Sequence, residues 1–324
     1  MGRIPPVAIG LPVYNGEKYL AESIESVLAQ DFGDFDFLIS DNCSTDSTWE
    51  ICNYYSLKDR RIRLNRNEKN LGAIGNFEFV LNNTDSKYFM WHSHDDLLDP
   101  SYVAECFSFL EQHDEYNICF SKVALIDENG RPYICELANE TRDEDSPILR
   151  FKHHCESGFP VYFIYGLIRR KVWRQIEPIP RMVKGVDRLL GAELAIYGKM
   201  YQINQTLRYF RTSTAPDAIM RNLITWGPQG LLAARNPIAF LPVTRWRLVL
   251  ISRINRATQL DHDIKSQLIK IAKNHLSFQT LVIGEIGYYK NVAKAYLLIY
   301  FPWLFNALRK LKKTSRIFLL SHGK

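Results

Sequence analysis

The sequence has few of the features that mark a specialised class of protein. Its six cysteines form no Cys-x-x-Cys pair, which argues against a structural zinc site or a disulfide scaffold and favours reduced thiols. It has no internal repeat and no low-complexity segment. The apolar run after Pro6 reaches the polar residues Asn15 and Glu17 too soon for the core of a signal peptide. These absences lead us to expect a globular protein that is made and kept in the cytoplasm.

Acidic residues are absent from the last part of the chain. The 324 residues include 41 Lys and Arg against 35 Asp and Glu, a formal charge of +6, but residues 286–324 contain eight basic residues and no acidic one. The first 285 residues therefore carry a formal charge of −2. No early run of Arg or Lys alternates with aromatic residues as on a nucleic-acid surface, so we expect no nucleic-acid partner.

The basic tail includes a short apolar segment. Residues 295–305 are 11 apolar residues broken by Pro302, well short of the ~20 that a membrane-spanning helix requires. Because Arg309 and Lys310 follow closely, residues 286–324 resemble an element that lies in a membrane interface, with aromatics at the acyl boundary and cations on anionic headgroups. A terminal helix that packs on the rest of the protein explains the same pattern. Both interpretations stay open at this point.

Strands and helices alternate through the first third of the chain. Because 46% of the residues are hydrophobic, the chain can bury a large core. Apolar runs predict strands and helical periodicity predicts helices, in the order strand 7–13, helix 17–29, strand 36–40, helix 48–57, strand 61–64, helix 76–82 and strand 87–91. This alternation predicts an α/β fold with a mostly parallel sheet covered by helices on both faces.

The rest of the chain alternates less regularly. The same patterns predict helix 102–112, strands 117–126 and 131–136, helix 186–197 and strand 199–204. From about residue 225 onward, the pattern predicts helices without strands between them.

Polar clusters follow three of the predicted strands, at residues 14–17, 41–46 and 92–96. Ligands of such sheets bind at the carboxyl ends of the strands, so we expect the three clusters to meet at one edge. Residues 44–46 are explained by a turn and a helix cap. Asp41 is not explained in this way, and it is placed to accept a hydrogen bond from a nucleobase or a ribose.

The third cluster holds the adjacent carboxylates Asp95 and Asp96. Mg²⁺ and Mn²⁺ suit such a pair, because proteins hold hard divalent cations with one or two carboxylates plus substrate phosphates. Capping of the next helix explains the same residues. A further interpretation takes His92 and His94, together with Asp95, as the transition-metal ligands of a hydrolase.

Taken together, the motifs resemble those of family-2 glycosyltransferases over residues 5 to about 130. The resemblance is carried by Pro12-Val13-Tyr14-Asn15 with Glu17, by Ser40 to Asp46, by Asn70-Leu71-Gly72 with Asn76, and by His94-Asp95-Asp96 followed by Pro100. It implies a GT-A fold, a nucleotide-sugar donor, a divalent cation (Mg²⁺ or Mn²⁺) held by Asp95 and Asp96, and inversion at the anomeric carbon. The nucleotide-sugar contacts that it implies are Pro12, Tyr14, Asn15, Glu17, Asp41, Gly72, Asn76 and Asp95.

Two positions depart from the family pattern. Ser93 stands where an acidic motif of the form Asp-x-Asp-Asp has its first Asp, which leaves metal coordination to lean on Asp95. Gly75 stands where many relatives carry an Arg just before the Asn, so a phosphate or base contact from that position must come from elsewhere or be absent. A protein that binds nucleotide sugars without transferring them is therefore a third alternative, beside the transferase and the hydrolase.

A looser resemblance covers the acceptor side. The segment from Lys184 to Leu190, followed by Gly198, resembles the family's acceptor helix, whose leading carboxylate is the general base. The resemblance implies that Asp187 is this base, with Glu193 as the fallback, and that Arg211 binds the diphosphate. The alternative for Asp187 is a helix N-terminal residue that the helix dipole stabilises. The alternative for Arg211 is a solvated surface residue.

The expected protein is an inverting glycosyltransferase that uses a UDP- or dTDP-sugar and a glycan or lipid-linked acceptor, in the synthesis of a surface polysaccharide. We expect a GT-A domain over residues 1–225, with a nucleotide-sugar half (1–130) and an acceptor half (131–225). A helical, basic extension is expected over residues 226–324. Its tail would allow peripheral binding to the inner face of the cell membrane.

Overall fold

A computed structural model describes residues 3–137, 143–157, 162–176, 178–179, 186–212 and 242–275. The first part of the chain forms β1 (Val7–Val13), α1 (Leu20–Leu28), β2 (Phe35–Asp41), α2 (Thr48–Lys58), β3 (Ile62–Arg66), α3 (Gly72–Asn82), β4 (Tyr88–Trp91), β5 (Leu97–Leu98), α4 (Tyr102–Gln112), β6 (Tyr116–Ile126) and β7 (Pro132–Leu137). It continues with α5 (Pro147–Ser157), the 3₁₀-helix η1 (Tyr162–Tyr165), β8 (Leu167–Arg169), α6 (Arg170–Trp173), α7 (Val186–Tyr197), β9 (Lys199–Arg211), α10 (Pro242–Arg256) and α11 (His262–His275).

The described strands form one mixed sheet. Its order is β3-β2-β1-β4-β8-β6-β9-β5, and β7 pairs with β6. The strands from β3 to β4 are parallel, as the alternation of strands and helices predicts. Beyond β4 the sheet is mixed, because β8 runs antiparallel to both β4 and β6 while β6 and β9 are parallel. The parallel arrangement is therefore confined mainly to the nucleotide half.

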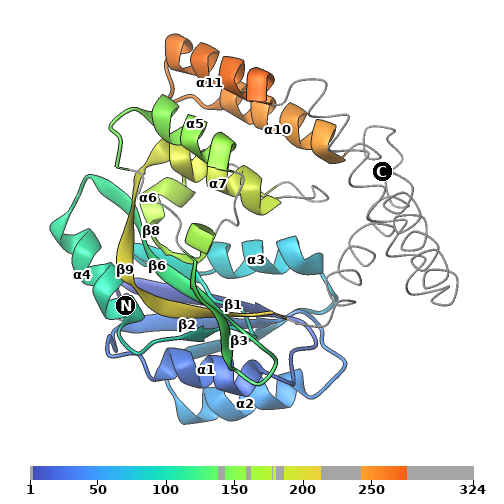
Figure 1. Ribbon diagram of the computed structural model, residues 1–324. Coiled ribbons are helices and arrows are strands. Elements are labelled where there is room, and N and C mark those ends of the chain that lie inside the picture. Colours follow the sequence, from blue (N-terminus) through green and yellow to red (C-terminus); the bar gives the residue numbers. More distant parts are fainter. Residues whose placement is uncertain are drawn as a thin grey trace, which may run out of the picture. The chain divides into compact units, whose positions relative to one another are not determined.

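Helices cover both faces of this sheet (Figure 1). In β1, the odd-numbered residues from Val7 to Val13 pack with α1, α2 and α4, while Ala8 lies in the cluster with α3, α6 and α7. Gly10 points toward α3, where an added Cβ would come within 2.7 Å of Val80 Cγ2. The sheet and α3 thus approach closely near the C-terminal end of α3.

The predicted elements are mostly present. The helices predicted over 102–112 and 186–197 coincide with α4 and α7. The strand predicted over 199–204 continues as β9 to Arg211, so Arg211 lies in the strand and not after it. The two-residue β5 and the three-residue β8 were not predicted.

The chain divides into two compact units. Residues 1–212 and 250–272 form the first, and residues 213–249 and 273–324 form the second. Helices α10 and α11 confirm that the extension contains helices. The predicted domain boundary at 225 and the basic tail over 286–324 lie outside the described residues. Among the helices of the described ranges, none is both long and apolar enough to cross a membrane.

Candidate active site

Hydrogen bonds join the loop after β1 to the loop after β2. Ser44 Oγ accepts from the backbone N–H of Asn15 at 2.9 Å, and Asn15 Oδ1 accepts from the N–H of Thr45 at 2.9 Å. Glu17 Oε2 accepts from the N–H of Ser47 at 3.1 Å. Asn15 has a φ of 51°, in the left-handed region that Asn tolerates better than most residues. The predicted contacts Asn15 and Glu17 therefore shape the loops through bonds to protein atoms.

The other two predicted residues of this segment differ in exposure. Pro12 lies in β1, where it is buried and aligned with Ser40 of β2. Tyr14, which directly follows β1, is 44% exposed. Tyr14 is thus the residue of this motif that presents a large side chain to solvent at the sheet edge.

Asp41 is the last residue of β2, and none of its surface is exposed. Its Oδ1 accepts from the N–H of Ser44 at 3.0 Å, and its Oδ2 lies 3.1 Å from Nε of Arg66 at the end of β3. The side chain of Arg66 is 42% exposed and also donates to the carbonyl of Ser44 at 3.0 Å. A buried carboxylate and a half-exposed guanidinium therefore lie together at the predicted nucleoside position.

Side-chain amides join the ends of β1 and β2 to α3. Asn76 is buried; its Nδ2 donates to the carbonyl of Ser40 at 2.8 Å, and its Oδ1 accepts from Asn67 Nδ2 at 3.0 Å. Asn42 Nδ2 donates to the carbonyl of Gly72 at 3.3 Å. Gly72 begins α3 with a φ of 75°, which favours glycine. Asn76 and Gly72 thus lie at the predicted edge, where the structure shows them bracing the loops.

The adjacent carboxylates Asp95 and Asp96, in the cluster that follows β4, have different surroundings. Asp95 is partly exposed, whereas Asp96 is buried and its Oδ1 accepts from the N–H of Arg211 at 3.1 Å. Burial, and then the charge of Asp95, raise the pKa of Asp96 to about 7. Asp96 Oδ2 lies 3.9 Å from the guanidinium of Arg208. Asp95 is therefore the carboxylate better placed to reach a ligand at the strand ends.

A divalent cation fits this arrangement only if the substrate supplies most of its ligands. Within the described ranges, no group of three or more His, Cys, Asp and Glu side chains could hold a metal ion. Mg²⁺ and Mn²⁺ commonly bind through one or two carboxylates plus substrate phosphates. The partly exposed Asp95 meets this smaller requirement, and Ser93 supplies no carboxylate.

His92 is completely buried at the end of β4. Its Nε2 lies 3.0 Å from Ser23 Oγ, and its Nδ1 lies 3.4 Å from an Nη of Arg208. Burial, and then the positive charge of Arg208, hold the pKa of His92 well below its usual value of 6.5. Both ring nitrogens face protein groups, so the structure gives no support to His92 as a metal ligand of a hydrolase.

Arg211 has its guanidinium surrounded by protein acceptors. Its Nε donates to the carbonyl of Asp95 at 3.0 Å, and one Nη donates to Glu22 Oε2 at 2.7 Å. The other Nη donates to the carbonyls of Asp127 and Glu128, each at 3.3 Å. The side chain is only 3% exposed. The structure therefore places Arg211 as a brace for the acidic motif, with no open face toward a diphosphate.

Asp187 and Glu193 lie on α7 in contrasting environments. Asp187 is exposed in the first turn of the helix, and residues 180–185 before it lie outside the described ranges. Glu193 is 4% exposed, and both of its carboxylate oxygens accept from Arg253 of α10. Because Glu193 is held in a buried ion pair, the structure favours Asp187 over it as a residue that can meet an acceptor.

More than half of the chain matches a known protein family. The model of the family described as "Glycosyl transferase family 2" matches residues 8–174, just over half of the chain. The chain belongs to glycosyl transferase family 2.

Relatives in this family are similar over part of the chain. An uncharacterized glycosyltransferase of Methanocaldococcus jannaschii, MJ1057, is 38% identical over 185 residues, which are 56% of this chain and 62% of the relative. The putative glycosyltransferase EpsE of Bacillus subtilis is 32% identical over 127 residues, 39% of this chain and 46% of EpsE. The chain thus spans less than two thirds of the length of these relatives.

Solved structures confirm the predicted GT-A fold. The crystal structure of S. aureus TarS 1-349 in complex with UDP-GlcNAc superposes with a TM-score of 0.61 at 19% identity, over 89% of this chain and 82% of that one. At this identity the likeness shows the fold alone. The sequence-based assignment to family 2 and to the GT-A fold is therefore correct.

Within this family-2 site, the sequence did not point to two arginines. Arg66 contacts Asp41, and Arg208 is 1% exposed beside His92 and Asp96. A predicted strand that continued to residue 208 would have included Arg208. A charged residue in a buried strand requires a buried partner, so this prediction would have pointed to Arg208. The strand predicted over 199–204 ended too early to give this signal.

Proposed function

We propose that this chain is an inverting glycosyltransferase that moves a sugar from a UDP- or dTDP-sugar to a hydroxyl group of a glycan or a lipid-linked acceptor. One observation carries the proposal: in a family-2 chain, Tyr14, Asp41 and Asp95 lie at the carboxyl ends of β1, β2 and β4, the edge where such sheets bind ligands. A UDP-sugar is the donor class that the TarS fragment holds in its crystal structure.

Asp41 is the proposed acceptor for the nucleoside. The N–H of Ser44 holds its carboxylate in place, and because none of its surface is exposed, a nucleoside reaches it only after a side chain beside it, such as the half-exposed Arg66, moves. A preorganised group of this kind loses little conformational entropy on binding. The exposed ring of Tyr14 lies at the start of the adjoining loop, where it can cover the base.

Asp95 is the proposed residue for a Mg²⁺ or Mn²⁺ ion, which would offset negative charge on the departing nucleoside diphosphate. Arg211 fixes the backbone of this motif through the carbonyl of Asp95 and the carboxylate of Asp96. The charged side chains of β9 thus act in our proposal by positioning the motif that contacts the donor.

Asp187 is the proposed general base. A sugar hydroxyl is a weak nucleophile until its proton is removed. In the proposed single displacement, the acceptor oxygen bonds to the anomeric carbon while the bond from that carbon to the diphosphate oxygen breaks. The hydroxyl proton passes to the Asp187 carboxylate, and the configuration of the anomeric carbon inverts.

The proposal extends to the domain boundary and to the basic tail. We propose that residues 1–225 form the transferase domain. We also propose that residues 286–324 bind a membrane surface, and this proposal rests only on the aromatic and basic residues of that segment. Surface polysaccharide synthesis on the inner face of the cell membrane would bring the enzyme and a lipid-linked acceptor together.

The variant Asp187→Asn tests the proposed base. We expect donor binding to persist and transfer to fall by about 10²–10⁴-fold, the usual contribution of a general base. Transfer is measured as label incorporated from UDP- and dTDP-sugars into a membrane-derived glycan fraction. Asp263→Asn is the matched control, because Asp263 is also in the first turn of a helix, α11. If the two variants transferred the sugar at equal rates, Asp187 would not be the general base, and its remaining role would be to interact favourably with the helix dipole.

A further inference from the structure

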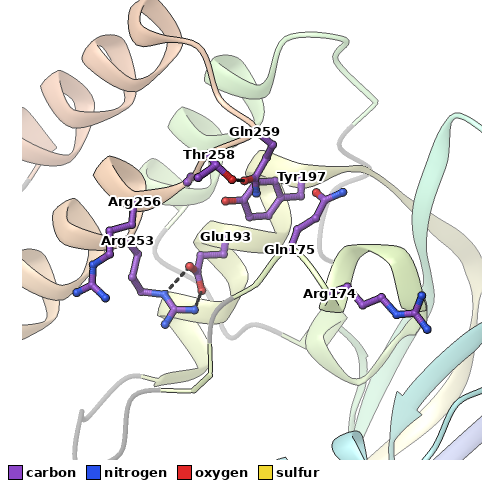
Figure 2. A pocket seen from close by; sticks show the side chains of 9 residues that line it. Arg174, Gln175, Glu193, Tyr197, Arg253, Arg256, Thr258 and Gln259 are labelled. Atoms are coloured by element: carbon purple, nitrogen blue, oxygen red, sulfur yellow. Dashed lines mark hydrogen bonds and ion pairs between the residues drawn. The ribbon is translucent and has the colours of Figure 1, made fainter.

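A cavity of about 360 Å³ lies among α6, α7, α10 and the link to α11 (Figure 2). This volume is in the range of sites that bind small molecules. Gln175, Glu193, Tyr197, Arg253, Thr258 and Gln259 are among its lining residues. None of its lining residues comes from β1, β2 or β4, so the cavity is separate from the strand ends of the candidate active site.

An ion pair forms the buried part of the lining. Arg253 Nε donates to Glu193 Oε1 at 2.5 Å, and an Nη donates to Glu193 Oε2 at 2.8 Å. The two side chains are 5% and 6% exposed. Because their charges are matched by a bidentate pair, this surface offers polar atoms without a net charge.

Part of the rim consists of uncharged groups that both donate and accept hydrogen bonds. Figure 2 shows the amides of Gln175 and Gln259 and the hydroxyls of Tyr197 and Thr258 gathered on one side of the ion pair. An amide has two donor hydrogens and an acceptor oxygen, and a hydroxyl can do either. The ring of Tyr197 adds an apolar face next to its hydroxyl.

The two remaining arginines of the lining point elsewhere. Figure 2 shows the guanidinium groups of Arg174 and Arg256 directed away from Gln175, Tyr197 and Gln259. Arg174 lies 3.1 Å from Asp85, and Arg256 donates to Ser252 Oγ of its own helix at 2.8 Å. A site for an anion would turn these cations inward. The arrangement suits a ligand that is neutral and rich in hydroxyl groups.

We propose that this cavity is a carbohydrate subsite that binds a neutral sugar unit of a glycan. Neighbouring sugar hydroxyls offer paired donors and acceptors, which the two amides match, and a sugar ring presents a C–H face that can lie on Tyr197. Along α7, Glu193 and Tyr197 lie about 9 and 15 Å beyond Asp187 at 1.5 Å per residue. The cavity therefore adds a remote contact for a long acceptor. This use as an acceptor contact rests on the proposed transferase function.

The test uses the full chain and three neutral tetrasaccharides: maltotetraose, cellotetraose and tetra-N-acetylchitotetraose. Titration calorimetry should detect millimolar binding of at least one of them. The double variant Gln175→Ala/Gln259→Ala should weaken it by about tenfold or more, the loss of one or two net hydrogen bonds. Both residues are exposed, so the folded structure should tolerate the change. Arg174→Ala/Arg256→Ala is the matched control on the same rim and should leave the affinity unchanged.

Three results would overturn the subsite: no tetrasaccharide binds, binding is equal in the two double variants, or inorganic phosphate binds and depends on Arg174 and Arg256. Binding of UDP with Mn²⁺, measured in the same variants, separates this inference from the proposed function. Loss of tetrasaccharide binding with UDP binding intact supports the subsite. Tetrasaccharide binding that depends on the two glutamines, in a chain that does not bind UDP, would sustain the subsite and reject the proposed transferase donor.

Discussion

Buried charges lie directly beneath the acidic motif. Arg208 donates to the carbonyl of Tyr165 at 2.9 Å and lies near both His92 Nδ1 and Asp96 Oδ2. Its cation stabilises a neutral imidazole on one side and compensates a carboxylate on the other. Since an uncompensated charge in such a place is costly, these three side chains hold one another, and with them the backbone that presents Asp95.

The buried His92 makes stability depend on pH in a defined direction. Its pKa in the folded protein is well below 6.5, whereas the unfolded chain titrates near 6.5. As the pH falls below about 6.5, the unfolded chain takes up a proton that folded His92 refuses, so the free energy of unfolding decreases, by up to about 1.4 kcal/mol per pH unit. His92→Gln keeps hydrogen-bonding groups but cannot titrate. We expect the stability advantage of the wild type over this variant to shrink from about pH 7.5 to 5.

Urea denaturation at several pH values measures this difference. Asp96, whose pKa is raised to about 7, titrates in both proteins and largely cancels in the comparison. His113→Gln, at a side chain that is 43% exposed, is the control for the loss of an imidazole. A constant difference between wild type and His92→Gln across this pH range would contradict a neutral, buried His92.

At the scale of residues, the sequence predicted which side chains lie near the strand ends better than it predicted their partners. Asp41 is the last residue of β2 and Asp95 comes shortly after β4, so both lie near the strand ends as expected. The partners of Asp41 and His92 are Arg66 and Arg208, which lie 25 and 116 residues away in the sequence. Such pairs depend on the order of strands in the sheet, which local patterns do not contain.

One ion pair connects α7 of the predicted acceptor half to α10 of the predicted extension. Arg253 of α10 binds Glu193 of α7 in bidentate fashion and also donates to the carbonyl of Pro178, close before α7, at 2.9 Å. These three acceptors belong to α7, whose first turn contains the proposed base Asp187, and to the segment that precedes it. The extension helix α10 therefore helps to fix the position of α7.

The variant Arg253→Met tests this connection. We expect it to lower the free energy of unfolding by about 3–5 kcal/mol, because it removes the cation that compensates the buried Glu193 carboxylate. The double variant Glu193→Met/Arg253→Met should recover much of the loss, since no buried charge then remains. Arg256→Met, at an exposed position of the same helix, is the control and should change stability by less than about 1 kcal/mol. Chemical denaturation of the wild type, Glu193→Met, Arg253→Met and the double variant gives the cycle, and additive losses would reject a coupled pair.

At the scale of elements, length helped prediction but did not decide it, because α4 was predicted and α5, which also has 11 residues, was not. The 11-residue α4 and the 12-residue α7 show enough helical turns for their periodicity to fix both ends. The strands β5 and β8 have two and three residues, too few for any period to be visible. Both pair antiparallel with longer strands, so their existence depends on neighbours in space.

For the whole molecule, the alternation of strands and helices predicted the parallel half of the sheet, whose carboxyl edge is the proposed ligand-binding edge. It did not predict that β8 lies between β4 and β6 and reverses direction there. All three residues of β8 are buried, so the strand shows no alternation of apolar and polar residues. Neither residue propensity nor an amphipathic pattern can therefore predict it. The order and direction of the strands in the mixed half of the sheet could therefore be known only from the structure.

Ligand binding at this edge should stabilise the folded chain. A ligand that binds only the folded state at 100 times its Kd adds about 2.7 kcal/mol to the free energy of unfolding. We expect UDP together with Mn²⁺ to raise the melting temperature more than UDP alone, because the ion we assign to Asp95 needs the phosphates to complete its ligands. In Asp95→Asn the increment due to Mn²⁺ should vanish, while the increment due to UDP alone remains. Asp34→Asn, at a 44% exposed side chain just before β2, should keep both increments. A full Mn²⁺ increment in Asp95→Asn would move the proposed metal site away from Asp95.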